Sequence, residues 1–271
     1  MAAPESGTQR PVALAVGAHP DDIEFMMAGT LLLLREAGAE IHMWNVANGS
    51  CGTVEHAREE IVRLRWQEAQ ASAREAGAAI YPPLVDDIAI YYDEKLLARA
   101  AALVRQVKPG IILTHSPTDY MEDHQNACRL TVSAAFVRGM RNFPTSPAVE
   151  PWTGDVALYH ALPYGLRDGL GRLVRAGHYV DVGPVLGRKR RMLACHRTQK
   201  QWLDVSQGVD AYLAQMEQMC RQAGSMSGRF QYAEGWRRHL HLGLCAAGSD
   251  PLSELLGARC WIDPEYERSL G

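Results

Sequence analysis

The sequence lacks three features that would point to common classes of protein: paired cysteines, a long apolar run and a strong net charge. Its six cysteines are scattered without a C-x-x-C pair, which suits neither a disulfide framework nor a cysteine-based zinc site. No stretch approaches the roughly 18 to 20 apolar residues that a membrane-spanning helix needs. The formal net charge of -3 gives no long-range attraction to nucleic acid or to an acidic membrane. We therefore expect reduced thiols, no membrane span and no nucleic-acid partner.

The first residues also do not predict a secretion signal. Residues 1–11 are polar and run directly into an expected strand, without the charged start, apolar stretch and small-residue cleavage site of a signal peptide. We expect a cytoplasmic protein. With 47% hydrophobic and 22% charged residues, the 271-residue chain has the composition of a globular protein that can bury a full core.

The apolar pattern alternates between short strand-like runs and longer helical runs. Residues 12–16 predict a strand that ends at Gly17, and residues 26–37 predict a leucine-rich helix that ends at Gly38. Further strands are expected at 40–47, 78–81 and 111–114, and further helices at 54–76 and 94–107. This alternation predicts an α/β fold, a Rossmann-like and mostly parallel sheet with helices on both faces.

The pattern changes after residue 142, where a proline-rich connection covers residues 144–151. Strands are expected at 155–162 and around 179–182, and helices at 187–199, 203–223 and 250–256. The basic run from Arg188 to Arg191 is typical of an exposed helix face. We expect a main domain over residues 1–200 and a C-terminal helical extension over residues 201–271 that packs on the same domain.

Polar clusters follow three of the expected strands, at residues 17–24, 48–53 and 115–126. In open sheets of parallel strands, ligands bind outside the carboxyl ends of the strands. We therefore expect these three segments to meet at one cleft.

The first cluster contains His19-Pro20-Asp21-Asp22, in which a His and an Asp three residues apart on a turn can face one metal ion. Imidazole nitrogen and carboxylate oxygen are suitable zinc donors, and a catalytic zinc usually has three protein ligands. The third donor is expected from Asp123-His124, which follows another strand. A carboxylate that does not coordinate the metal, such as Asp21, is a natural general base.

The same four residues also have a purely structural interpretation. The proline can set a turn, and the aspartates can cap the helix that begins near Ile23. Only the wider context separates the two interpretations.

The segment Ala18 to Glu24 resembles the A-H-P-D-D-x-E signature of the LmbE-like (PIG-L) deacetylases. Further segments resemble this family in the same order, and the resemblance covers roughly residues 12–200. They are a loop N-G-S-C-G at 48–52 that resembles the family's glycine-rich loop and a helix with Arg65 and Glu68 that resembles its R-x-x-E helix and ends at Gly77. The segment D-Y-M-E-D-H at 119–124 resembles the family's D-x-H-x-D-H signature, and H-R-T-Q at 196–199 resembles its late H-x-S-Q motif.

This resemblance implies a zinc-dependent hydrolase that removes an N-acetyl or N-acyl group from a small amino sugar or its glycoside. The zinc ligands would be His19, Asp22 and His124, although these donors also serve other divalent metals. The general base that takes a proton from zinc-activated water would be Asp21. The substrate would be bound by Arg65, Asp87 and His196.

The sequence departs from the family three residues before the last ligand, where Met121 replaces a histidine that stabilises the oxyanion or protonates the amine. Methionine can do neither. The nearest candidates for this catalytic role are His115 and Tyr120, and His196 is a third.

Two other functions stay open. The same ligands could serve hydrolysis of another amide or of a phosphoester, or the chain could be a non-catalytic sugar-binding member of the family. Asp21 argues against the second, because a decayed site needs no base. The sequence does not identify the substrate, and it leaves open whether the chain forms a homo-oligomer.

Overall fold

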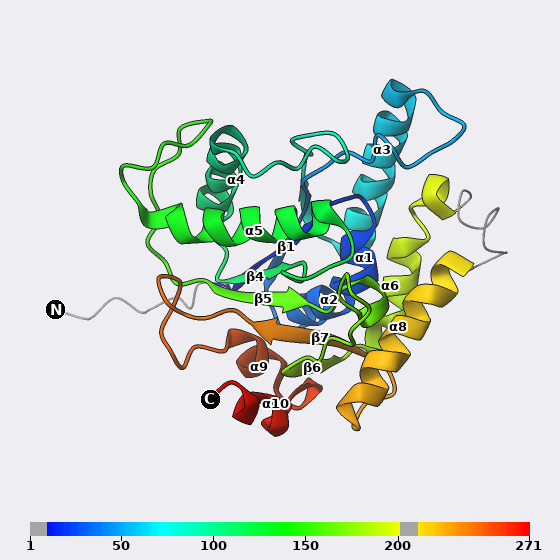
Figure 1. The fold of residues 1–271 in the computed structure, drawn as a ribbon, viewed down its shortest axis with the longest axis vertical. Coiled ribbons are helices and arrows are strands. Elements are labelled where there is room, and N and C mark those ends of the chain that lie inside the picture. Colours follow the sequence, from blue (N-terminus) through cyan, green and yellow to red (C-terminus); the bar gives the residue numbers. More distant parts are fainter. Residues whose placement is uncertain (1–9, 201–210) are drawn as a thin grey trace.

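The computed structural model describes residues 10–200 and 211–271, which form a sheet with helices on both faces (Figure 1). Within these residues the sheet has eight strands in the order β3-β2-β1-β4-β5-β7-β6-β8. Strands β1 to β5 pair in parallel, and β7, β6 and β8 continue the sheet in antiparallel pairs. The predicted α/β class with a mostly parallel sheet is confirmed. The strands are β1 (Val12–Gly17), β2 (Glu40–Asn45), β3 (Ala79–Tyr81), β4 (Ile111–Thr114), β5 (Ala157–Ala161), β6 (His178–Asp181), β7 (Ala233–Arg238) and β8 (Cys260–Ile262).

Alternate residues of each central strand supply two separate apolar cores. In β1, Leu14 and Val16 face a core shared with α4 (Glu94–Val107) and α5 (Glu122–Phe136). Ala13 and Ala15 face the opposite core. That core is shared with α1 (Asp22–Met26), α2 (Ala28–Glu36), α3 (Arg58–Ala76), α6 (Leu186–Leu193), α8 (Ala211–Ser227) and α9 (Pro251–Leu256), and a short helix α10 (Pro264–Ser269) ends the chain. None of the helices in the described part of the chain is long and apolar enough to cross a membrane.

Most of the predicted elements lie within a few residues of their observed bounds, but α5 was not predicted. The sequence pattern also placed the start of α3 at residue 54, whereas the helix begins at Arg58. The predicted helix 203–223 partly falls on residues 201–210, which lie outside the described residues. Its remainder corresponds to α8.

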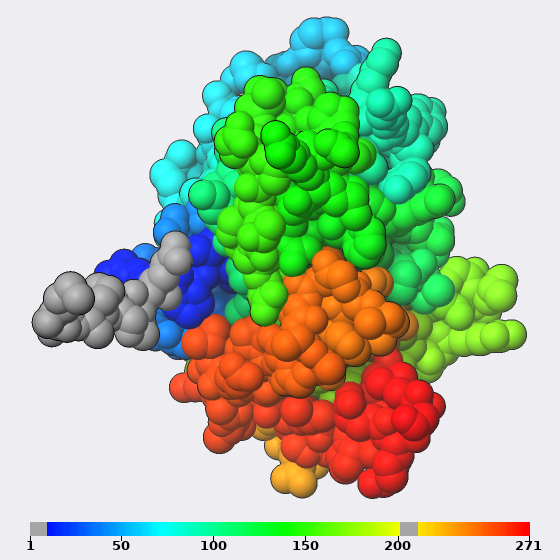
Figure 2. Space-filling view, turned by 90° about the vertical axis from the view of Figure 1, so that its left-hand side faces the viewer, coloured from blue at the N-terminus to red at the C-terminus, as the bar shows by residue number. Residues whose placement is uncertain are grey.

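The sequence predicted a helical C-terminal extension, but the described C-terminal residues also contribute two strands to the sheet. Strand β7 lies inside the sheet, between β5 and β6, and β8 forms an edge next to β6. The sequence of β7, AEGWRR, contains no β-branched residue, and this explains why no strand was expected there. Figure 2 shows the C-terminal residues, in orange and red, lying directly against the green middle of the chain. The boundary between residues 200 and 201 stays a prediction.

A buried ion pair joins β7 to the helices that follow β1. Lys189 of α6 is fully buried and donates to a carboxylate oxygen of Glu234 in β7 and to the carbonyl oxygen of Phe25, at 2.9 Å. The two carboxylate oxygens of Glu234 also accept the backbone N–H groups of Gly29 and Thr30, at 2.8 and 2.7 Å, and so satisfy the start of α2. The prediction of an exposed helix face is wrong for Lys189, because this counter-ion lies far away in sequence.

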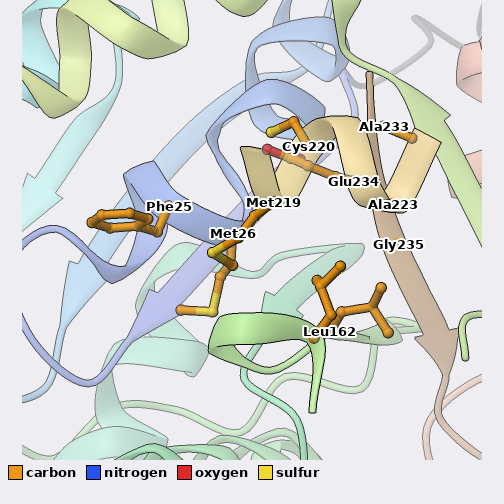
Figure 3. A pocket seen from close by; sticks show the side chains of 10 residues that line it. Phe25, Met26, Leu162, Met219, Cys220, Ala223, Ala233, Glu234 and Gly235 are labelled. Atoms are coloured by element: carbon orange, nitrogen blue, oxygen red, sulfur yellow. The ribbon is translucent and has the colours of Figure 1, made fainter. Parts of the chain in front are cut away.

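A small cavity of about 20 Å³ lies beside this ion pair, and Glu234 contributes to its lining. Figure 3 shows Met26 of α1, Met219 of α8 and Leu162, which follows β5, around it. A space of this size holds about one water molecule. It is therefore a packing defect beside the ion pair and not a site for a substrate.

We predict that Glu234→Gln strongly destabilises the protein, because it leaves the Lys189 ammonium group buried without a counter-ion. The free energy of unfolding should fall by about 3 to 5 kcal/mol. The matched control is Glu217→Gln, which breaks the ion pair with Arg190 in which the two side chains are 33% and 45% exposed. That change should cost about 0 to 1 kcal/mol. Denaturant unfolding measures both, and equal effects would contradict the prediction.

Candidate metal centre and active site

The loops that follow β1, β2 and β4 meet at one cavity of about 390 Å³, together with residues from α3 and α8. Parallel pairing of β2, β1 and β4 brings the carboxyl ends of these strands to the same edge of the sheet. This is the convergence that the three polar clusters predicted. The lining consists of His19, Asp21, Asp22, Phe25, Cys51, Gly52, Arg65, Asp87, Ile88, Tyr120, Met121, His124, Tyr164, Gln199 and Tyr212.

The side chains of His19, Asp22 and His124 form a group of buried potential metal donors. One donor atom of each lies within 4.8 Å of the others. The carboxylate of Asp22 lies between the rings, with Oδ2 3.5 Å from Nδ1 of His19 and Oδ1 3.3 Å from Nε2 of His124. Two imidazoles and one carboxylate are a donor set that suits zinc and leaves room for a further ligand.

Two further carboxylates hold the outer nitrogens of these imidazoles. Oδ2 of Asp123 lies 2.9 Å from Nε2 of His19, and Oδ1 of Asp119 lies 3.1 Å from Nδ1 of His124. Metal-binding histidines typically have such partners, which fix the ring and the tautomer. The inner nitrogens of both rings are thereby left facing Asp22, so the residues present fit a divalent metal ion.

The electrostatics of this group also favour a cation. Burial lowers the pKa of both imidazoles, but the surrounding carboxylates outweigh it and raise the pKa of His19 to about 10 and that of His124 to about 9. Positive charge is therefore stabilised where the three donors meet.

Asp21 lies beside this donor group in a constrained conformation. Its φ of 110° is in the left-handed region, which is uncommon for residues other than glycine. Its Oδ2 accepts a hydrogen bond of 2.7 Å from the Tyr212 hydroxyl and lies 3.5 Å from Nη2 of Arg65. Burial raises the pKa of the Asp21 carboxyl, and the Arg65 guanidinium opposes this. Arg65 also donates to the carbonyl oxygen of Pro20, so it contacts the turn both at Pro20 and at Asp21.

The R-x-x-E helix and the late H-x-T-Q segment bind each other along one face of α3. Arg65 donates to Oε1 of Gln199 at 2.8 Å. One turn further on, Glu68 accepts from the backbone N–H and the hydroxyl of Thr198, at 2.9 and 2.7 Å. These motifs therefore hold the wall of the cavity, and Arg65 and Gln199 also line it.

His196 belongs to the same network and does not reach the cavity. It is fully buried, and its Nε2 lies 3.2 Å from Oε1 of Glu24 in α1. Glu24 also accepts a hydrogen bond from Ser72 of α3. The geometry thus does not support the predicted substrate contact, because the ring points into the packing between α1 and α3.

His115 also lies behind the site. It is fully buried and does not line the cavity; its Nε2 accepts the backbone N–H of Ala18 at 2.8 Å and lies 3.2 Å from Oδ2 of Asp22. Its ring stacks on His124 with a centroid distance of 4.2 Å. The predicted direct role at an oxyanion is not supported by this position. With Asp119 and His124 it forms a second group of close donors, but this group shares His124 with the first.

Asp87 and Tyr120 both reach the cavity, as predicted. The carboxylate of Asp87 accepts the backbone N–H groups of Gly49 and Cys51, at 2.7 and 2.9 Å, and so shapes the glycine-rich loop. Tyr120 is 60% exposed, and its ring stands edge-on to His124 at 5.7 Å.

Three aromatic residues of the lining were missed by sequence reasoning. Phe25 of α1 stands edge-on to Tyr164 and to Tyr212, with centroid distances of 5.4 and 5.0 Å. Phe25 directly follows the first signature and could have been suspected. Tyr212 had no local signal, because it lies 191 positions from its partner Asp21 in the sequence.

Comparison with known proteins agrees with this fold. Residues 14–135 match the family described as PIG-L, GlcNAc-PI de-N-acetylase. A diacetylchitobiose deacetylase from Thermococcus kodakarensis is 26% identical over 231 residues, which cover 83% of this chain and 81% of the relative. A 4-oxalmesaconate hydratase from Pseudomonas putida is 29% identical over 138 residues, 48% of this chain and 54% of the relative.

Two solved structures show the same fold. The 4-carboxy-2-hydroxymuconate hydratase from Pseudomonas putida has a TM-score of 0.66 and 25% identity, over 84% of this chain and 95% of that one. The N,N'-diacetylchitobiose deacetylase from Pyrococcus horikoshii has a TM-score of 0.72 and 20% identity, over 85% and 84%. Residues 14–135 thus match the PIG-L (LmbE-like) family, and the resemblance seen in the sequence is confirmed.

We predict that the purified protein holds about one divalent metal ion per chain and that His124→Ala loses it, because that change removes one of three protein ligands. The matched control is His56→Ala, since His56 pairs with Glu60 near the surface and does not line the cavity. Elemental analysis of both variants is the measurement. Full metal content in His124→Ala would remove this residue from the ligand set.

Proposed function

We propose that the protein is a metal-dependent hydrolase that removes an N-acetyl or N-acyl group from an amino sugar. The main observation behind this proposal is that the carboxylate of Asp21 lines the cavity beside the donor group of His19, Asp22 and His124. The PIG-L domain and the likeness to a diacetylchitobiose deacetylase support an acylated sugar as the substrate. We keep a small-molecule substrate and a cytoplasmic location as parts of this proposal.

A divalent ion held by His19, Asp22 and His124 would act as a Lewis acid that polarises the amide and makes water more acidic. The protein's own part is to hold and move protons. Oδ2 of Asp21 is engaged by Tyr212 and Arg65, so Oδ1 is the oxygen that takes the proton of the attacking water. When the carbon–nitrogen bond breaks, Asp21 returns this proton to the leaving amine, and the acyl group leaves as a carboxylic acid.

The hydroxyl of Tyr120 is our candidate for the role that Met121 cannot fill. Both residues line the cavity, but only the tyrosine carries a hydrogen-bond donor. The phenol would donate to the negative oxygen of the tetrahedral intermediate. His115 and His196 do not contact the substrate in this proposal, because His115 stacks on His124 behind the site and His196 lies against Glu24.

Sugar hydroxyls would be bound by the polar lining. Asp87, Gln199 and the edge of Arg65 line the cavity and combine acceptors with donors, as a polyhydroxylated ligand requires. Arg65 is only 2% exposed, so its main effect passes through Asp21 and Pro20.

A second candidate is hydration of a carbon–carbon double bond, because one Pseudomonas putida hydratase is 29% identical over 138 residues and another is 25% identical with 84% of this chain covered. Met121 is compatible with hydration, since water addition has no amine to protonate.

The charges of the cavity favour the first candidate, amide hydrolysis. Among the described lining residues, Arg65 is the only Lys or Arg and Asp21 already engages it, whereas Asp21, Asp22 and Asp87 supply three carboxylates. Apart from the divalent ion, the described lining therefore offers no unengaged Lys or Arg to a phosphoester or to a substrate rich in carboxylates.

We predict that Asp21→Asn retains the metal but loses activity by roughly 10²- to 10⁴-fold, because the amide keeps the shape of the side chain but cannot accept the proton. Amine release from an N-acetylglucosaminide and metal content are measured on the same preparation. The control is Asp86→Asn, which changes a neighbouring carboxylate that binds Asn48 and Arg58 and does not line the cavity. Full activity of Asp21→Asn would contradict the proposed base. An unmodified protein that hydrates a conjugated dienoate and releases no amine would favour the second candidate.

We also predict that Tyr212→Phe lowers kcat by about 10- to 100-fold with little change in metal content, because a hydrogen bond to a charged group is lost. In the Asp21→Asn background the same change should have almost no further effect, since Tyr212 acts through Asp21. Tyr91→Phe, at an exposed tyrosine outside the cavity, is the control. Additive losses in the double variant would show that Tyr212 acts independently of Asp21.

A further inference from the structure

Ile88 combines an unfavourable backbone with an exposed apolar side chain. Its φ of 62° lies in the left-handed region, which is a true outlier for a β-branched residue. Its side chain is nevertheless 58% exposed and lines the cavity. Neither burial in the core nor a favourable backbone accounts for an isoleucine at this position.

The site needs the backbone of residue 88 but not its side chain. The N–H of Ile88 donates to Oδ2 of Asp123 at 2.6 Å, and the same oxygen holds His19. The preceding residue, Asp87, binds the glycine-rich loop. Glycine or asparagine would adopt this left-handed conformation with less strain and donate the same hydrogen bond. The isoleucine side chain therefore has another reason to be there, and such strain is typical of ligand-binding positions.

Tyr120 is a second apolar surface that the cavity exposes. Its ring lies 6.1 Å from that of Tyr164, which in turn stands edge-on to Phe25. Aromatic lining thus continues from the exposed Tyr120 to the buried Phe25 of α1. The polar groups that suit sugar hydroxyls, Asp87 and Gln199, lie on other segments of the lining. The cavity is therefore amphipathic, and its volume of about 390 Å³ is within the range that holds ligands of drug-like size.

We propose that Ile88 and Tyr120 form an apolar subsite that selects acylated amino sugars carrying an apolar substituent. This inference rests on the proposed function and specifies its substrate class. The substituent is either an apolar group on the anomeric oxygen or an acyl chain longer than acetyl. Both would bring apolar surface into contact with the two exposed side chains and remove it from water.

The test compares three substrates with the complete metal-loaded protein. The first is free N-acetylglucosamine, the second an alkyl or aryl N-acetylglucosaminide, and the third N-hexanoylglucosamine. The readout is the ratio of kcat/KM between each substituted substrate and the free sugar, which cancels general losses of activity. A preference for the second substrate assigns the subsite to the anomeric substituent, and a preference for the third assigns it to the acyl chain.

Variants at residue 88 separate the effect of the apolar side chain from the effect of the left-handed backbone. Ile88→Asn tolerates the left-handed conformation but is polar, and its preference ratio should fall about tenfold. Ile88→Val keeps a β-branched apolar side chain and should retain most of the ratio. Tyr120→Ser should reduce the ratio, whereas Leu242→Ser should not, because Leu242 is 64% exposed but lies outside the cavity lining. Ile88→Gly should melt at an equal or higher temperature than the unmodified protein while its ratio falls, because strain is relieved.

An unchanged ratio in folded Ile88→Asn and Tyr120→Ser would overturn the subsite, as would an unmodified protein with no preference for either substituted substrate. Should the protein release no amine from any of the three, the proposed function fails instead. Calorimetric binding of an alkyl N-acetylglucosaminide and of N-hexanoylglucosamine, each compared with free N-acetylglucosamine in the same variants, then tests the subsite without turnover. Equal binding of all three ligands by the unmodified protein would overturn it.

Discussion

The buried carboxylate of Asp22 is the point on which the site depends. Its Oδ2 accepts the backbone N–H of His19 at 2.7 Å and lies 3.2 Å from His115, and its Oδ1 lies 3.3 Å from His124. Burial alone would raise the pKa of Asp22, but the adjacent imidazoles hold it well below its usual range. An ionised carboxylate in this position costs several kcal/mol unless it is fully compensated. The groups that compensate Asp22 come from the loops after β1 and β4, so these loops must pack against each other. The cavity therefore lies at the edge of the sheet where these two strands end.

Around this centre, the motif residues mostly bind each other. Asp119 and Asp123 hold the histidine rings, Arg65 and Tyr212 hold Asp21, and Glu68 holds the late motif at Thr198. The C-terminal part of the chain belongs to this support. Tyr212 reaches Asp21 from α8, and Glu234 in β7 caps α2 and neutralises Lys189. A reacting group must be held within a fraction of an ångström, and these contacts supply that rigidity.

Backbone strain is concentrated where the cavity is. Of the four non-glycine residues with positive φ in the described part of the chain, Asp21 and Ile88 line it. Each is held by contacts to other segments: Asp21 by Tyr212 and Arg65, and Ile88 by Asp123. Such conformations persist only when the surroundings over-determine them, so the stability of the sheet and its helices is used here to shape the site.

The sequence by itself determined the alternating strands and helices, the three polar clusters and the candidate metal donors His19, Asp22 and His124. It could do so because periodicity is a local property, and because few residue types can bind a metal or carry a proton. Parallel strands then bring their carboxyl ends together whatever the details of packing. Only the tertiary structure decided that His115 and His196 lie behind the cavity, that Tyr212 reaches Asp21, that Lys189 is buried and that β7 enters the sheet. Each of these features depends on which distant segment packs against the residue, and the residues next to it in the sequence do not identify that segment.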